Sequence, residues 1–284
     1  MNFEKLILQN DSRGISELSK YLHPSFCLNA AKLVLDNIEK VFITTGFYIK
    51  NSAAIETDGP LGAISIGNAL ENIGYEVVYI TDQYIDKYIR QLSSKNSRQI
   101  LFPIMNIEDS KIFSKNLITK ESPTLLIGIE RPGAHTDNKY RNMRDVEFTQ
   151  YVARIDTLFD YKIKSIGIGD GGNEIGMGNL FQQVLDSKNL VNFPAMSQVS
   201  ELIISSVSNW GGYGLVGALS QIQQTNLLPS ISTSETQLKE LVELGAVDGI
   251  SGIQEYSVDG FDIKTNSKIL EQIALEASRT ENFS

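Results

Sequence analysis

The chain has 284 residues, of which 42% are hydrophobic, so it is long enough for one large core or two small ones. Its formal net charge of −9 argues against a nucleic-acid-binding surface, which needs clustered Lys and Arg side chains. The single cysteine, Cys27, has no partner for a disulfide within this sequence. No apolar run approaches the ~20 residues that span a bilayer, and residues 1–19 lack the pattern of a signal peptide. We therefore expect a cytoplasmic protein that binds neither nucleic acid nor a membrane.

Short apolar, β-branched runs alternate along the chain with segments of helical periodicity. The runs predict strands at 41–45, 76–81, 99–103, 124–129, 164–168 and 201–207, the third being the weakest. The other segments predict helices at 60–73, 82–93, 107–115, 174–185, 214–224 and 265–277. Several strands are apolar on both faces, which is typical of a parallel sheet covered by helices. The alternation predicts an α/β fold with a doubly wound, mostly parallel sheet and helices on both faces, a three-layer sandwich.

Neither a linker nor a long repeat divides this pattern, so we expect a single domain over residues 1–284. The polar segment 131–148 interrupts the alternation, and such a segment predicts a lid or an excursion over the edge of the sheet. Near the end of the chain, Asp248 and Asp259 each precede a glycine. Asp-Gly pairs predict turns.

Acidic and amide side chains follow three of the predicted strands. In an open parallel sheet, ligands bind at the carboxyl ends of the strands, and these ends share one edge. Each acid alone has an ordinary structural explanation, such as helix capping by Asp58 ahead of Pro60. Together they predict one shared site. The residues are Glu56, Asp58, Glu130, Asp170, Asn173 and Glu174.

A glycine-rich stretch, SIGIGDGGNEIGMGN (Ser165–Asn179), stands at a predicted strand-to-helix turn and matches the dinucleotide pattern G-x-G-x-x-G. Two features argue against a bound pyrophosphate. Asp170 and Glu174 place negative charge at the loop, and two unit charges about 4 Å apart repel by roughly 4 kcal/mol at an effective dielectric constant near 20. In addition, no acidic ribose-binding residue ends the next strand.

A divalent cation fits this loop better than a pyrophosphate does. Magnesium and manganese prefer carboxylate and amide oxygens, whereas two histidines and one cysteine supply a zinc site poorly. The glycines would let the backbone approach a ligand closely. The predicted ligands of the magnesium or manganese ion are Glu56, Asp58, Asp170, Asn173 and Glu174.

Four longer motifs carry a family resemblance. They are ETDGPLGA (Glu56–Ala63), ERPG with YRNMR (130–133 and 140–144), GIGDGGNEIGMGN (Gly167–Asn179) and SNWGGYGL (Ser208–Leu215). Together they resemble the C-terminal domain family of D-glutamate cyclase, over about residues 41–261. The resemblance implies conversion of D-glutamate to 5-oxo-D-proline and water, a carbon–oxygen lyase reaction. The chain departs from the family pattern at Asp145, where the family has a glycine.

This reaction gives the candidate residues predicted roles. Glu130, Asp170 and Glu174 are the predicted catalytic carboxylates, with Glu130 accepting the proton of the substrate ammonium group. Arg131, Arg141 or Arg144 is predicted to clamp the α-carboxylate, although each arginine also fits a solvated surface charge. The other predicted substrate-binding residues are Tyr140, Gly171, Gly172, Asn209 and Trp210.

Two alternative functions stay open. Other members of the family resemble metal-dependent enzymes that act on phosphorylated compounds, so a manganese- or magnesium-dependent phosphatase is one of them. A non-catalytic domain that binds a metal or an amino acid is the other. Both enzyme hypotheses predict a small anionic substrate, and the sequence leaves a homo-oligomer open.

Overall fold

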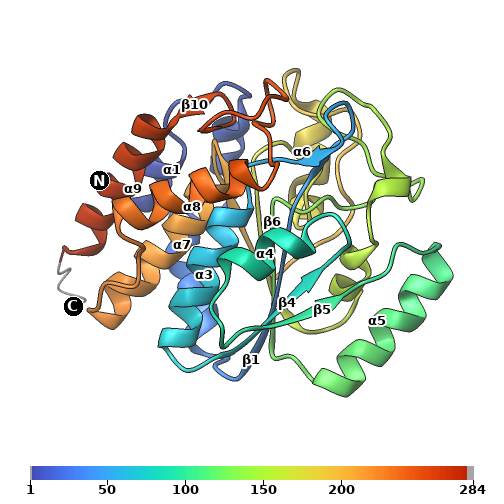
Figure 1. The fold of residues 1–284 in the computed structure, drawn as a ribbon, viewed down its shortest axis with the longest axis horizontal. Helices are drawn as coiled ribbons and strands as arrows, with labels where there is room; N and C mark the ends of the chain where they lie inside the picture. The colour runs from blue at the N-terminus through green and yellow to red at the C-terminus, as the bar shows by residue number, and fades with distance from the viewer. Residues whose placement is uncertain (1, 280–284) are drawn as a thin grey trace.

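The computed structural model describes residues 2–279, and its centre is a six-stranded parallel sheet (Figure 1). The strands lie in the order β5-β4-β1-β6-β7-β8. In chain order this arrangement reads 3-2-1-4-5-6, so the sheet is doubly wound, as predicted, and the direction of winding reverses between β1 and β6. The bounds are β1 Lys40–Thr45, β4 Glu76–Thr81, β5 Arg98–Leu101, β6 Leu125–Ile129, β7 Lys164–Gly169 and β8 Glu201–Ile204.

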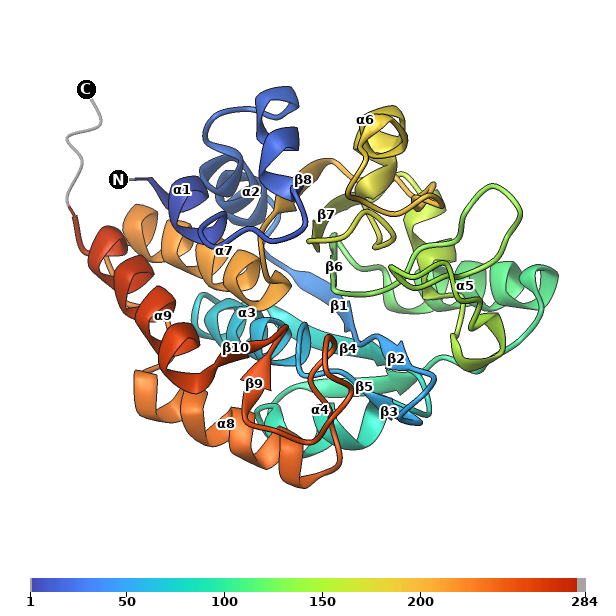
Figure 2. The same ribbon diagram turned by 90° about the horizontal axis from the view of Figure 1, so that it is seen from above.

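Helices cover both faces of the sheet, which gives the predicted three layers (Figure 2). The first face carries α3 (Pro60–Asn72), α4 (Asp86–Leu92) and α7 (Ser208–Gln223), with α1 (Phe3–Ile7), α2 (Phe26–Leu35), α8 (Ile231–Glu243) and α9 (Ile263–Ala277) packed around them. The second face carries α5 (Ile107–Glu121), α6 (Phe181–Asp186) and a 3-10 helix, Ile155–Asp160.

The central strand β1 shows why both faces are apolar. Val41 and Ile43 lie in the larger core, beneath α3 and α7, whereas Phe42 lies in the smaller core on the other face. Because side chains alternate along a strand, a strand buried on both sides reads as a continuous apolar run. This is the local signal from which the strand is predictable.

The structure adds elements that the sequence did not predict. Besides α1, α2 and α8, these are two antiparallel pairs, β2 (Tyr48–Ile49) with β3 (Ala54–Ile55) and β9 (Ser257–Val258) with β10 (Phe261–Asp262). Two further 3-10 helices span Ile15–Tyr21 and Thr149–Tyr151. Among residues 2–279, none of the helices has the length and apolar character needed to cross a bilayer.

Several predicted elements differ in their bounds. Strand β8 ends at Ile204, and α7 begins at Ser208 instead of residue 214, so the glycine-rich stretch after β8 is helical. The predicted helix at 174–185 is replaced by a 3-10 helix, Met177–Leu180, followed by α6. Helix α4 begins late because the Asp82 side chain accepts backbone N–H bonds in the preceding turn.

The glycines at the start of α7 allow it to lie against α3. A Cβ atom on Gly212 would lie 2.9 Å from the Cα atom of Gly62, so no larger side chain fits there without a shift of the backbone. This close approach brings the N-terminal ends of both helices to the carboxyl edge of the sheet.

Candidate active site

A cavity of about 90 Å³ lies beside the carboxyl ends of the central strands, close to the point where the strand order reverses. Four of the predicted acids line it: Glu56, Glu130, Asp170 and Glu174. Its walls come from the β2–β3 hairpin and from the tip of the predicted lid, residues 142–146. The topology therefore brings together side chains that are far apart in the sequence.

Six carboxylates surround the inner end of this cavity. Asp58, Asp170 and Asp259 each offer an oxygen atom within 4.8 Å of the others, and so do Glu130, Asp170 and Glu174. Asp170 belongs to both sets. Glu56, 6% exposed, lies in the same cavity. Either set of three is compact enough for its oxygens to share one cation.

The glycine loop binds a carboxylate of its own chain. Glu174 Oε1 accepts a hydrogen bond from the backbone N–H of Gly171, and Glu174 Oε2 accepts one from Gly172, both at 2.8 Å. Gly172 has a φ of 107°, a conformation that favours glycine. These amides are the groups that would hold a phosphate in a dinucleotide-binding loop. Because Glu174 already occupies them, the loop is not arranged for a pyrophosphate.

Asp58 and Asn209 cap each other's helices. The Asp58 carboxylate accepts hydrogen bonds from the backbone N–H groups of Ser208 and Asn209 at the start of α7, both at 2.7 Å. In return, Asn209 Oδ1 accepts from the N–H groups of Gly59 and Gly62 at the start of α3. Asp58, expected from the sequence to cap α3, therefore caps the neighbouring helix α7, and on its own side it accepts only from the N–H group of Gly59, the residue that precedes α3. The positive ends of two helix dipoles lie beside the acids.

Glu130 has an unusual backbone conformation. Its φ of 42° lies in the left-handed region, which costs a residue other than glycine roughly 1–2 kcal/mol. Its side chain is buried, and its Oε2 atom accepts a hydrogen bond of 2.6 Å from Ser208 Oγ. Strained residues of this kind are concentrated at functional sites.

Burial and mutual repulsion make the cluster difficult to ionise fully. Burial, together with the charge of Asp259, raises the pKa of Asp58 to about 8. Burial also raises the pKa of Glu130 well above its usual range, with Asp170 and Glu174 adding to the effect. The pKa of Glu56 rises for the same reasons. Either protons or a cation must compensate this density of carboxylates.

Several carboxylate oxygens have no hydrogen-bond partner among the described residues. These buried atoms are Glu56 Oε1, Asp170 Oδ2 and Asp259 Oδ1. Asp170 Oδ2 lies against the Arg13 guanidinium, but not in hydrogen-bonding geometry. An unpaired buried carboxylate oxygen is costly. The donor set therefore fits a hard divalent cation, which prefers oxygen ligands.

Sequence reasoning missed two residues of the cluster. Arg13 forms ion pairs with Asp170 and with Asp259, the latter at 2.8 Å. Burial opposes its charge, but Asp170 and Asp259 raise the pKa of Arg13 well above its usual value. Asp259 stands at the predicted Asp-Gly turn, between β9 and β10. The turn was predictable, whereas the direction of the Asp259 side chain depends on the tertiary fold.

Comparison with known families decides the affiliation of the chain. The model of the family described as "D-glutamate cyclase-like, C-terminal" matches residues 4–274. The chain belongs to this family. Human mitochondrial D-glutamate cyclase is 30% identical over 286 residues, which cover 86% of this chain and 46% of the human protein. The chain thus spans about half the length of this relative.

Solved structures are only distantly similar to this family member. The apo form of LigD from Sphingobium sp. strain SYK-6 is 8% identical, with 84% of this chain and 87% of that chain covered and a TM-score of 0.27. A dehydrogenase/reductase from Sinorhizobium meliloti 1021 is 13% identical, with 89% and 94% covered and the same TM-score. Similarity at this level supports no conclusion about function.

Arg131 takes a structural role in this member of the D-glutamate cyclase-like family. Its guanidinium donates hydrogen bonds to Asp82 at 2.6 Å and to the carbonyl oxygen of Ala153 at 2.8 Å, and it is 2% exposed. It is not among the residues that line the cavity. The structure therefore does not place Arg131 where it could clamp a substrate.

Tyr140 and Arg141 likewise contact other residues of the chain and do not face the cavity. Tyr140 is fully buried, and its hydroxyl group donates to Asp156. Arg141 pairs with Asp137 at 2.5 Å and lies over the ring of Phe193. Neither side chain lines the cavity.

Of the three predicted arginines, Arg144 alone lines the cavity. Trp210 is fully buried, and its indole N–H donates to Asn266, so the structure does not bring it to the cavity. Asn173 lines the cavity but donates its amide N–H to the Arg141 carbonyl oxygen, which ties the glycine loop to the predicted lid.

The tip of the predicted lid contains a residue in the left-handed conformation. Asp145 has a φ of 60°, the left-handed conformation that suits the glycine of the family pattern and that aspartate tolerates. Asn142 Oδ1 accepts hydrogen bonds from Arg144 and Val146 and closes the turn. The stem of the segment packs through Tyr140 in a small apolar cluster.

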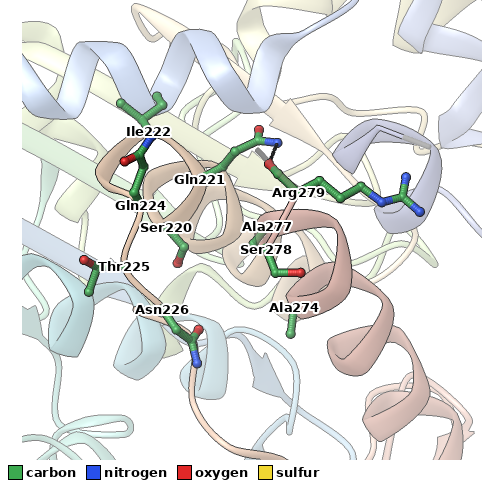
Figure 3. Close-up of a pocket in the computed structure, with 10 residues that line it drawn as sticks. All are labelled: Ser220, Gln221, Ile222, Gln224, Thr225, Asn226, Ala274, Ala277, Ser278 and Arg279. Carbon is green, nitrogen blue, oxygen red and sulfur yellow. Dashed lines mark hydrogen bonds between the residues drawn. The ribbon is translucent and has the colours of Figure 1, made fainter. Parts of the chain in front are cut away.

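A second cavity, of about 430 Å³, lies between the C-terminal ends of α7 and α9 (Figure 3). Among the residues that the structure describes, those that line this cavity are mostly small or polar, and Arg279 is the one charged residue among them. These residues offer neither paired carboxylates nor a nucleophile beside a base. This second cavity therefore has no group of reactive side chains comparable to the acidic cluster.

Proposed function

We propose that this chain is a cation-assisted catalytic domain that converts D-glutamate to 5-oxo-D-proline and water. The observation that carries the proposal is the cluster of buried carboxylates, with unpartnered oxygens, at the carboxyl edge of the sheet. The 30% identity to human mitochondrial D-glutamate cyclase supports the choice of reaction. In the proposal, a magnesium or manganese ion is held by Asp170 and Glu174, directly beside Glu130. When bound, such an ion supplies Lewis-acid polarisation of a carboxylate oxygen.

Positive side chains at the rim suit the second carboxylate of the substrate. Lys50 and Arg144 both line the cavity and are exposed, and each makes only a long contact of 3.4 Å to a backbone carbonyl oxygen. Their charges are therefore available to a ligand. In the proposal they hold the α-carboxylate at the mouth, so that the γ-carboxylate reaches the acids inside.

Glu130 is the residue that we assign to proton transfer. In the reaction, the amine nitrogen forms a bond to the carbon of the γ-carboxylate, one oxygen of that carboxylate departs, and two of the three ammonium protons leave with it as water. A carboxyl group must therefore accept a proton from nitrogen and return it to the departing oxygen. The hydrogen bond from Ser208 Oγ to Glu130 Oε2 fixes the orientation of this carboxylate for the transfer.

The test is turnover of the two glutamate enantiomers by the manganese-loaded protein. We expect 5-oxoproline from D-glutamate but not from L-glutamate, with loss of at least about tenfold in rate for Glu130→Gln, since general acid–base groups contribute roughly 10²–10⁴-fold. Asp137→Asn, a change at an exposed carboxylate outside the cavity, is the control. Absence of product from the loaded protein, or release of phosphate from a panel of phosphoesters in its place, would overturn the proposal.

A further inference from the structure

The two sets of carboxylates differ in the charge that they face. The set Asp58, Asp170 and Asp259 contacts a guanidinium group, because Arg13 forms ion pairs with both Asp170 and Asp259. Within residues 2–279, Glu130 and Glu174 form no ion pair with any cationic side chain, although they share Asp170 with the first set. The Arg13 guanidinium therefore compensates the charge of Asp170 and Asp259, whereas no described cationic side chain pairs with Glu130 or Glu174.

Arg13 is held in place from its own segment of the chain. Asp11 Oδ1 accepts hydrogen bonds from the backbone N–H groups of Arg13 and Gly14, and Asp11 Oδ2 accepts one from Ser16. Gly14 has a φ of 85°, which turns the chain into the following 3-10 helix. The Arg13 side chain is 13% exposed and reaches the acids at the inner end of the cavity. Its position is therefore part of the fold and not a chance surface contact.

The unpartnered Oε1 atom of Glu56 is a second, independent sign of a ligand. This atom is buried, has no hydrogen-bond partner, and belongs to a residue that lines the cavity with Glu130, Asp170 and Glu174. Arg13 does not satisfy it, since the two ion pairs of Arg13 go to Asp170 and Asp259. The cluster still lacks positive charge on the side of Glu56 and Glu130.

We propose that Arg13 occupies the position of a second cation, so that the site takes a single divalent ion at Glu130, Asp170 and Glu174. This inference rests on the proposed cation site. It also argues against a two-metal phosphoryl-transfer site, which clamps both the attacking and the leaving oxygen between two ions, because a fixed guanidinium takes the second place here.

The test is the number of Mn²⁺ ions bound by the chelator-stripped full chain in isothermal titration. We expect one ion for the wild type and one for Arg90→Met, which removes an exposed arginine that pairs with Asp86 and does not line the cavity. For Arg13→Met, which keeps a long side chain without its charge, we expect two. In the double variant Arg13→Met with Asp259→Asn, we expect the number to return to one.

Each outcome separates the two proposals. No ion bound by the wild type would overturn the cation site and this inference with it. Two ions bound by the wild type would overturn this inference alone, and so would one ion bound by a folded Arg13→Met variant. If that variant does not fold, the electron paramagnetic resonance spectrum of the Mn²⁺-saturated wild type decides: we expect the signal of isolated ions, and the signal of a coupled pair of ions contradicts the inference.

Discussion

At the scale of single residues, a side chain can fit either substrate binding or a structural role until its partners are known. Arg131 follows strand β6 directly and stands beside Glu130, so the sequence places it at the correct edge of the sheet. Its guanidinium turns away from the cavity, to Asp82 after β4 and to a carbonyl oxygen of residue 153. Arg144, which lies fifteen residues after the end of the same strand, in the polar segment, is the arginine that reaches the cavity. A linear pattern contains no information on these directions.

The structural role of Arg131 is testable by substitution. Because removal of one member of a buried ion pair leaves the other charge unpaired, we expect Arg131→Met to lower the free energy of unfolding by about 3–5 kcal/mol. Arg90→Met, at an exposed pair, should change it by less than about 1 kcal/mol. Urea denaturation measures both. Unchanged stability of Arg131→Met combined with a raised KM for D-glutamate would show instead that Arg131 binds substrate.

At the scale of elements, local patterns predict the strands and the starts of α3 and α5 well, but the starts of α4 and α7 poorly. The five strong strand predictions coincide with β1, β4, β6, β7 and β8 because each strand is an apolar, β-branched run. The start of α7 was not predictable, because SNWGGYG is rich in glycine, which disfavours helices. Its first N–H groups are capped by Asp58, 150 residues earlier in the chain. Capping between distant segments leaves no local signal.

The same limit applies to the candidate site. Acids directly after a predicted strand, such as Glu130 and Asp170, could be assigned to one edge because the topology of a parallel sheet fixes where strands end. Asp259 and Arg13 lie in short connections outside the sheet, so no rule placed them there. Trp210 was misplaced because an aromatic residue near a predicted strand end fits a pocket wall as well as a core.

At the scale of the whole molecule, the acid cluster makes stability depend on pH. A carboxyl group whose pKa is raised by folding holds a proton that the unfolded chain releases, so its contribution to stability is lost as the pH rises through the folded-state value. For Asp58 the contribution is lost over a pH window from about 4, the pKa in the unfolded chain, to about 8, the pKa in the folded protein. Folding raises the pKa values of Glu56 and Glu130 as well, so both groups act in the same direction. Asp137, whose pKa is lowered to about 2 by Arg141, titrates below the window.

We therefore expect the chelator-stripped protein to melt at a lower temperature at about pH 8 than at about pH 5. Addition of Mn²⁺ at the higher pH should raise the melting temperature, because an ion that binds only the folded state stabilises it. Circular dichroism measures both effects. A melting temperature that rises over this pH interval without metal would mean that the carboxylates are not forced to hold protons.

The most direct test of the cation site is anomalous X-ray scattering from crystals of the manganese-loaded protein. We expect a manganese peak among the carboxylates of Glu130, Asp170 and Glu174, close to Glu56. A crystal that shows manganese only elsewhere, or none at saturating concentration, would contradict the assignment of this cluster as a cation site.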